Sequence, residues 1–175
     1  MPRLEDLPTW TVAEVVDRVG STDRAPGGGA AGGIVIALAA ACALKAVLMT
    51  LKHHPEDTDL QPAAARLRDI AEEALRGGTD DAVTFARLIL AYQMPHDTDD
   101  AAEVRRSAIR QEAAGTVEIA TRLDRLAREI MAITEPLRPR VAANMASDVA
   151  AAFTLARAGE QIQADNIAQG RKAVG

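Results

Sequence analysis

The stretch that decides the fold runs from residue 25 to residue 44, with the sequence APGGGAAGGIVIALAAACAL. After three successive glycines it shows no polar face before Lys45, and a helix that is apolar all round is a central one. The run from 30 to 44 holds about 15 residues, whereas a membrane span needs roughly 20. We therefore expect a helix buried in a bundle and not a membrane helix.

The composition around this stretch favours helices throughout the chain. Aromatic residues make up 2% of the 175, and the common residues are Ala, Leu, Arg and Glu, which favour helices over strands. With 48% apolar residues, the chain is long enough for one domain with a buried core. We expect an all-α protein that forms a single domain over residues 1–175.

Apolar periodicity and terminal signals divide the chain into helical segments. Thr11 and Glu14 form a capping box, and Pro55, Pro95 and Pro136 interrupt the periodic pattern. Helices are predicted over residues 11–19, 29–52, 60–94, 98–134 and 140–168, with a bend at 77–78 left open and a frayed tail over 169–175. Four to five helices joined by short loops make an up-and-down bundle.

Charge, cysteine and histidine content argue against several classes of function. The net charge is −5 without a dense Lys/Arg tract, so nucleic-acid binding is not expected. A single cysteine, Cys42, forms no disulfide framework, and residues 1–10 do not resemble a signal peptide, so we expect a cytoplasmic protein. His53, His54 and His96 lack the spacing of a zinc site, and no metal is expected.

The glycine turn formed by Pro26, Gly27, Gly28 and Gly29 has two interpretations. Its free N–H groups at a helix N-terminus would suit a carboxylate or phosphate. Equally, three glycines could serve a tight turn that packs one helix against another. The spacing of the residues alone does not favour either interpretation over the other.

Two further polar groups interrupt the apolar pattern. Asp81 lies four residues before Phe85, so it could point toward the core, although a helix cap at Asp80 after the glycines at 77–78 is the favoured interpretation. A second polar patch lies near the last helix and is formed by Asn144, Ser147 and Asp148, which are spaced three and four residues apart. This patch could line a pocket with Asn166, or it could be a capping or bend motif.

The ordered set of these motifs resembles the cyclodeaminase/cyclohydrolase family, which includes the cyclodeaminase domain of formiminotransferase-cyclodeaminase and bacterial methenyltetrahydrofolate cyclohydrolases. The family's Ala-Pro-Gly-Gly-Gly-Ser motif is matched by residues 25–30, and its Asp-x-x-x-Phe and Leu-Pro signature by residues 81–85 and 94–95. The matches continue with an arginine, an Asn-x-x-Ser-Asp signature and a terminal asparagine, at Arg105, Asn144, Ser147, Asp148 and Asn166.

The resemblance implies an all-α homodimer with a folate site in a cleft at the subunit interface and no prosthetic group. A cyclodeaminase closes 5-formimidoyltetrahydrofolate to the 5,10-methenyl form with release of ammonia, and a cyclohydrolase opens the methenyl ring with water. Asp81 and Asp148 would stabilise the amidinium-like cation and move protons. The implied substrate-binding residues are Pro26, Gly27, Gly28, Gly29, Arg105, Asn144, Ser147 and Asn166.

The chain departs from the family pattern at Ala30, Lys45, His96 and Gly170. Lys45 replaces a methionine among apolar neighbours, and His96 replaces a lysine, so both are also candidate catalytic groups. These departures leave two alternatives to folate chemistry. One is a repurposed paralogue that cyclises or deaminates a non-folate molecule, and the other is a catalytically inactive bundle that serves in binding or assembly.

Overall fold

The computed structural model describes residues 3–174, and helices account for almost all of that range. The α-helices are α1 (Val12–Val19), α2 (Gly28–His53), α3 (Gln61–Tyr92), α4 (Asp99–Thr134) and α5 (Ala146–Val174). Short 3-10 helices precede α1 and lie in the connections at Leu4–Thr9, Thr58–Leu60, Glu135–Leu137 and Ala143–Met145. The prediction of an all-α protein is confirmed.

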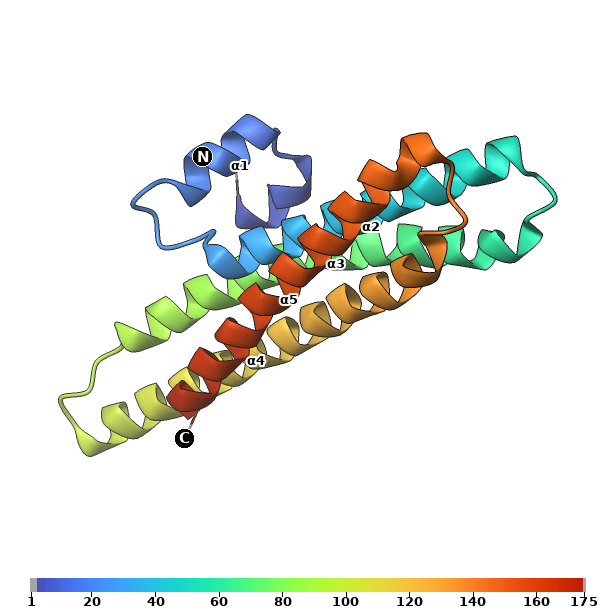
Figure 1. The fold of residues 1–175 in the computed structure, drawn as a ribbon. Coiled ribbons are helices and arrows are strands. Elements are labelled where there is room, and N and C mark those ends of the chain that lie inside the picture. Colours follow the sequence, from blue (N-terminus) through green and yellow to red (C-terminus); the bar gives the residue numbers. More distant parts are fainter. Residues whose placement is uncertain (1–2, 175) are drawn as a thin grey trace.

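The four long helices form an antiparallel bundle in which each helix packs beside the next along the chain (Figure 1). The last helix, α5, closes the ring by packing against both α4 and α2. Fully buried side chains from three of the helices fill the centre, among them Ile36, Leu67, Leu123 and Ile130. This arrangement confirms the predicted up-and-down topology.

Glycines allow α2 to approach its two neighbours closely. A Cβ built on Gly33 would lie 2.6 Å from the Cα of Gly78 on α3, so neither position tolerates a side chain without a shift of the backbone. On the other side of α2, a Cβ on Gly159 of α5 would overlap Ile36. The glycines of the sequence therefore serve helix packing as well as the turn before α2.

The α3 helix passes through Gly77 and Gly78 without a break. The predicted cap at Asp80 is therefore wrong, because tertiary contacts hold both glycines inside the helix. Gly77 packs on Leu123, and the Asp80 carboxylate pairs with Arg122 of α4.

The α5 helix differs from its prediction at both ends. It begins at Ala146, after a turn and a 3-10 helix, and not at residue 140. It continues to Val174, so the predicted frayed tail is helical as far as it is described. Gly170 explains the extension, because its lack of a side chain lets the end of α5 pack on Val117 of α4.

The short helix α1 lies outside the bundle, near the N-terminal end of α2 (Figure 1). Its predicted capping box is confirmed, since the Thr11 hydroxyl accepts from the Glu14 N–H and the Glu14 carboxylate accepts from the Thr11 N–H. No residue of α1 is buried, and Val12 and Val16 are largely exposed.

The apolar helix α2 is longer than the uninterrupted apolar run at residues 30–44. With 26 residues it is long and apolar enough, by length and composition alone, to cross a membrane. The core helix of a soluble bundle meets the same criteria, and Ala39, Ala40 and Ala43 are fully buried against neighbouring helices. The apolar run of about 15 residues therefore covers only part of the helix.

Candidate active site

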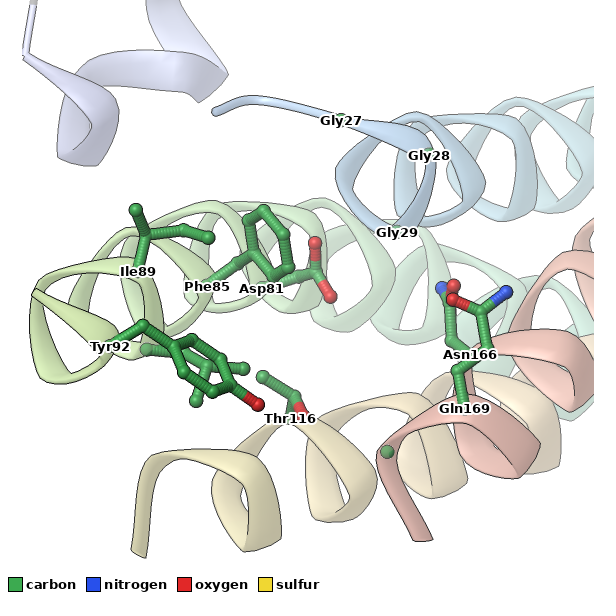
Figure 2. A pocket seen from close by; sticks show the side chains of 12 residues that line it. Gly27, Gly28, Gly29, Asp81, Phe85, Ile89, Tyr92, Thr116, Asn166 and Gln169 are labelled. Carbon is green, nitrogen blue, oxygen red and sulfur yellow. The ribbon is translucent and has the colours of Figure 1, made fainter. Parts of the chain in front are cut away.

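A cavity of about 440 Å³ opens between the first turn of α2, the second half of α3, the middle of α4 and the end of α5 (Figure 2). It is lined by Gly27, Gly28, Gly29, Asp81, Phe85, Leu88, Ile89, Tyr92, Thr116, Asn166, Gln169 and Gly170. All four long helices contribute to it, so the bundle must be complete for the cavity to form.

Asp81 is the only ionisable carboxyl group in this lining. It is 8% exposed, and burial raises its pKa to about 6, although a hydrogen bond from the Ala30 N–H acts in the opposite direction. A carboxyl group with a pKa near neutrality can both accept and donate a proton at physiological pH. The position of Asp81 therefore suits acid–base chemistry.

The absence of a side chain at Gly29 in the glycine turn leaves room for the Asp81 carboxylate. A Cβ on Gly29 would overlap the Asp81 carboxylate, whereas a Cβ on Gly27 or Gly28 would meet nothing within 4 Å. No described glycine has a positive φ, so the turn needs glycine for close approach and open space and not for unusual backbone angles.

This arrangement bears on the predicted anion site at the turn. Asp81 already lies beside the first turn of α2, where the positive end of the helix dipole stabilises a negative charge. When ionised it would repel a second carboxylate, so a cationic group of a ligand fits beside Gly29 better than an acidic one.

The cavity combines an apolar wall with polar groups on two opposite sides. Its apolar wall comes from α3, where Phe85 and Tyr92 remain partly exposed beside Leu88 and Ile89. In Figure 2 the Asp81 carboxylate lies to the left of Gly29, at the start of α2, and the amides of Asn166 and Gln169 lie to its right. A flat heterocycle with polar groups at two opposite edges would match this distribution.

Gln163 lies behind the cavity wall and was not predicted from the sequence. Its side chain is fully buried; Nε2 donates to the Gly29 carbonyl at 3.2 Å, and Oε1 accepts from Asn166 Nδ2 at 3.3 Å. It occupies a position in the buried stripe of α5 formed by Ala152, Ala156 and Gly159, spaced three and four apart. A polar residue in such a stripe was the signal that could have identified it.

Several of the predicted site residues meet at the cavity. Gly27, Gly28, Gly29, Asp81 and Asn166 line it, although they are far apart in sequence. The departure at Gly170 also lies in the lining, where a Cβ would come within 2.5 Å of Val117 Cγ2.

Other predicted residues lie near the cavity without lining it. Pro26 is buried directly before the turn, after a cis peptide bond from Ala25. The Arg105 guanidinium donates to the Tyr92 carbonyl at 3.1 Å, at the end of α3. His96 is exposed in the loop between α3 and α4.

The remaining predicted residues lie toward the opposite end of the bundle. Lys45 pairs with Asp148 at 3.4 Å, and its side chain is 62% exposed in the subunit. Asn144 and Ser147 are exposed next to this pair. Because Lys45 follows Gly28 by 17 residues, the pair lies about 26 Å along α2 from the cavity.

The described residues contain no group of three His, Cys, Asp or Glu side chains that could hold a metal ion.

The comparisons with known proteins agree on one family. The family model described as formiminotransferase-cyclodeaminase matches residues 11–169. The methenyltetrahydrofolate cyclohydrolase of Methylorubrum extorquens is 24% identical over 160 residues, which cover 90% of this chain and 77% of that protein. The crystal structure of formiminotetrahydrofolate cyclodeaminase from Thermotoga maritima superposes with a TM-score of 0.84 at 19% identity, covering 96% of this chain and 81% of that one.

The family match extends over the turn at 27–29, Asp81 and Asn166, the same residues that the fold brings together around the cavity. The chain therefore belongs to the formiminotransferase-cyclodeaminase family.

Proposed function

We propose that this protein is an enzyme that acts on a C–N bond of the one-carbon unit carried by tetrahydrofolate, with the cavity at Asp81 as its active site. The observation that carries this proposal is the enclosed Asp81 carboxyl group beside the glycine turn, opposite the Asn166 amide. The two relatives, a methenyltetrahydrofolate cyclohydrolase and a formiminotetrahydrofolate cyclodeaminase, support the substrate class.

Asp81 would act first through its charge. The 5,10-methenyl form of the cofactor is an amidinium cation, and an ionised carboxylate in an apolar enclosure attracts such a cation more strongly than it would in water. The apolar wall of Phe85, Leu88, Ile89 and Tyr92 would cover the reduced pterin ring and exclude water from one side.

Asp81 would then move protons. In the hydrolase direction it takes a proton from the water that attacks the amidinium carbon, which leaves a neutral hydroxyl adduct. When the bond from that carbon to N5 breaks, Asp81 returns its proton to N5, and the hydroxyl proton is released as the formyl group forms. In the lyase direction N10 would attack the formimidoyl carbon, and the N10 proton would pass to the former imine nitrogen. Protonated Asp81 would then donate one more proton to that amine, so that it departs as ammonia and the 5,10-methenyl cation remains.

Both reactions pass through a tetrahedral carbon, so one site geometry serves either. The test is to supply the purified protein with each of the two substrates separately. Loss of the methenyl absorbance above the uncatalysed rate identifies a cyclohydrolase, and its appearance together with ammonia from the 5-formimidoyl form identifies a cyclodeaminase.

An Asp81→Asn variant should lower kcat/KM by about 100-fold or more in whichever assay is positive, since general acid–base catalysis is worth about 10²–10⁴ in rate. The matched control is Asp80→Asn, which removes an exposed carboxylate next to it in the chain. Absence of both turnover and binding with either folate would overturn the proposal.

The exposed face of α2 supports a homodimer as the active form. In the most apolar 18-residue stretch of α2, only 39% is buried within the subunit. Exposed residues recur at helical spacing along one face, at Leu38, Ala41, Lys45 and Leu48. An apolar helix face of this length is typical of an interface between identical subunits.

A two-fold axis near Leu38 would also explain the two separated groups of family residues. Gly28 and Leu48 are each ten residues from Leu38. Antiparallel pairing of two α2 helices about that point would therefore place Lys45 and Asp148 of one subunit beside the glycine turn of the other. We propose that the active site is shared between subunits in this way.

A further inference from the structure

Four polar or charged side chains are buried among the described residues, and two of them converge on one turn of α2. The buried hydroxyls of Thr50 and Thr134 donate to carbonyls of their own helices, so they need no other element. Asp81 from α3 and Gln163 from α5 instead both contact Gly29, one at its Cβ position and the other at its carbonyl. Only Asp81 reaches the cavity.

The fold makes room for the Gln163 amide at a specific position. A Cβ on Gly32 would overlap Gln163 Nε2 and lie 2.9 Å from Ile162 Cγ2. Any larger residue at position 32 would therefore displace this amide. A buried amide is costly unless it is hydrogen-bonded, and both polar atoms of Gln163 have partners.

The partners fix the direction of every hydrogen bond in the group. The Gly29 carbonyl can only accept, so Gln163 must turn its Nε2 toward it. The Oε1 of Gln163 then faces Asn166 and can only accept, so Asn166 must turn its Nδ2 inward. Within residues 3–172 the Oδ1 of Asn166 has no hydrogen-bond partner, and Asn166 lines the cavity.

We infer that Gln163 is a positioning residue, which uses the fixed polarity of the Gly29 carbonyl to orient Asn166 so that its Oδ1 accepts from an N–H group of the bound molecule. The inference rests on the proposed function for the identity of that molecule, but the orientation of Asn166 does not depend on it. The recognised group is an N–H at the edge of a nitrogen heterocycle or amidine, opposite Asp81.

The first measurement needs no ligand. The two Nδ2 protons of Asn166 are observed in ¹⁵N-labelled protein and are identified because their signals disappear in Asn166→Ala. We expect them to exchange with solvent at rates that differ by about tenfold, because one of them is hydrogen-bonded to a buried acceptor. Gln163→Met, which keeps the side-chain length and removes both polar atoms, should abolish the difference. Equal exchange of the two protons in the wild type would overturn the inference.

The second measurement separates binding from chemistry. Gln163→Met and Asn166→Ala should each raise KM about tenfold, the equivalent of one hydrogen bond of about 1.4 kcal/mol, with kcat within about twofold of the wild type. The double variant should match Asn166→Ala alone, because Gln163 acts through Asn166. Additive effects on KM, or an unchanged KM in Asn166→Ala, would overturn the inference.

The control is Gln161→Met on the same helix, which removes an exposed amide bonded to Asp165 and should change neither measurement. If Gln163→Met does not fold, the exchange rates of the wild type and the KM of Asn166→Ala still test the inference. If the wild type turns over neither folate, the proposed function fails, and the exchange measurement alone decides the role of Gln163.

Discussion

The carboxylate of Asp81 lies where a side chain at Gly29 would have to be. This relationship joins α3 to the first turn of α2, and it explains why the third glycine of the turn differs from the first two. It also places the one ionisable carboxyl group of the cavity against backbone on one side and open space on the other.

Gly29→Ala should therefore damage both the site and the fold. The added methyl group must displace Asp81 or separate α2 from α3, and overpacking of this kind costs about 1–3 kcal/mol. We expect kcat/KM to fall by about 100-fold, as in Asp81→Asn, with a lower midpoint in urea denaturation. Gly28→Ala is the matched control, since its Cβ meets nothing, and its stability should equal or exceed that of the wild type.

Asp81→Asn should stabilise the protein above neutral pH. Because the pKa of Asp81 is raised from 3.8 to about 6, its protonated form adds stability that is fully present below pH 3.8 and lost as the pH rises through about 6. Asparagine does not ionise, so the variant should exceed the wild type by up to about 3 kcal/mol at pH 8, and the difference should vanish near pH 4. Urea denaturation at both pH values measures it, and a variant that is less stable at pH 8 would contradict the burial argument.

The pH dependence of turnover should report the same group. In the hydrolase direction Asp81 must be ionised to accept a proton from water, so kcat/KM should fall about tenfold per pH unit below about 6 and stay level above it. The residual activity of Asp81→Asn should lack this step. A wild-type profile that stays level down to pH 4.5 would remove Asp81 as the base.

Leu38→Arg should separate the subunits without unfolding them. Leu38 is 52% exposed in the subunit and lies at the proposed two-fold axis, where a pair of arginines would repel each other. We expect a monomer by analytical ultracentrifugation, with unchanged helical circular dichroism and loss of activity. Val104→Arg on α4, at a comparably exposed position, should remain a dimer.

Mixing two inactive variants tests whether the site is shared between subunits. In a hybrid of Asp81→Asn with Asp148→Asn, one of the two sites would be free of both substitutions. Random exchange of subunits should therefore restore about a quarter of the wild-type activity, since half of the dimers are hybrids with one intact site. No recovery on mixing, with subunit exchange verified by native mass spectrometry, would place each site within one subunit.

The sequence predicted local features well and tertiary ones less well. The capping box at Thr11 and the ends of α2, α3 and α4 followed from signals within a few residues of one another. The continuity of α3 through Gly77 did not, because the contact that holds it comes from Leu123 on another helix. Local propensity alone favoured a break there.

The site shows the same division. The glycine turn, Asp81 and Asn166 could be named from motifs, and the fold brings them together around one cavity. Periodicity could not show that Lys45 lies on the exposed face of α2. In a helix that is apolar all round, the pattern does not distinguish the buried face from the exposed one. Gln163 was not predicted, because one of its polar partners, Gly29, lies on another helix and the other, Asn166, lies one turn further along α5.

The cavity joins residues 27–29 to residues 166–170, and this has a consequence for biosynthesis. The glycine turn leaves the ribosome before the wall that carries Asn166, which follows more than a hundred residues later. A nascent chain can therefore form α2 and α3 and bury much of their shared surface, but it cannot bind a ligand at Asp81 until α5 has been translated and has packed against α2.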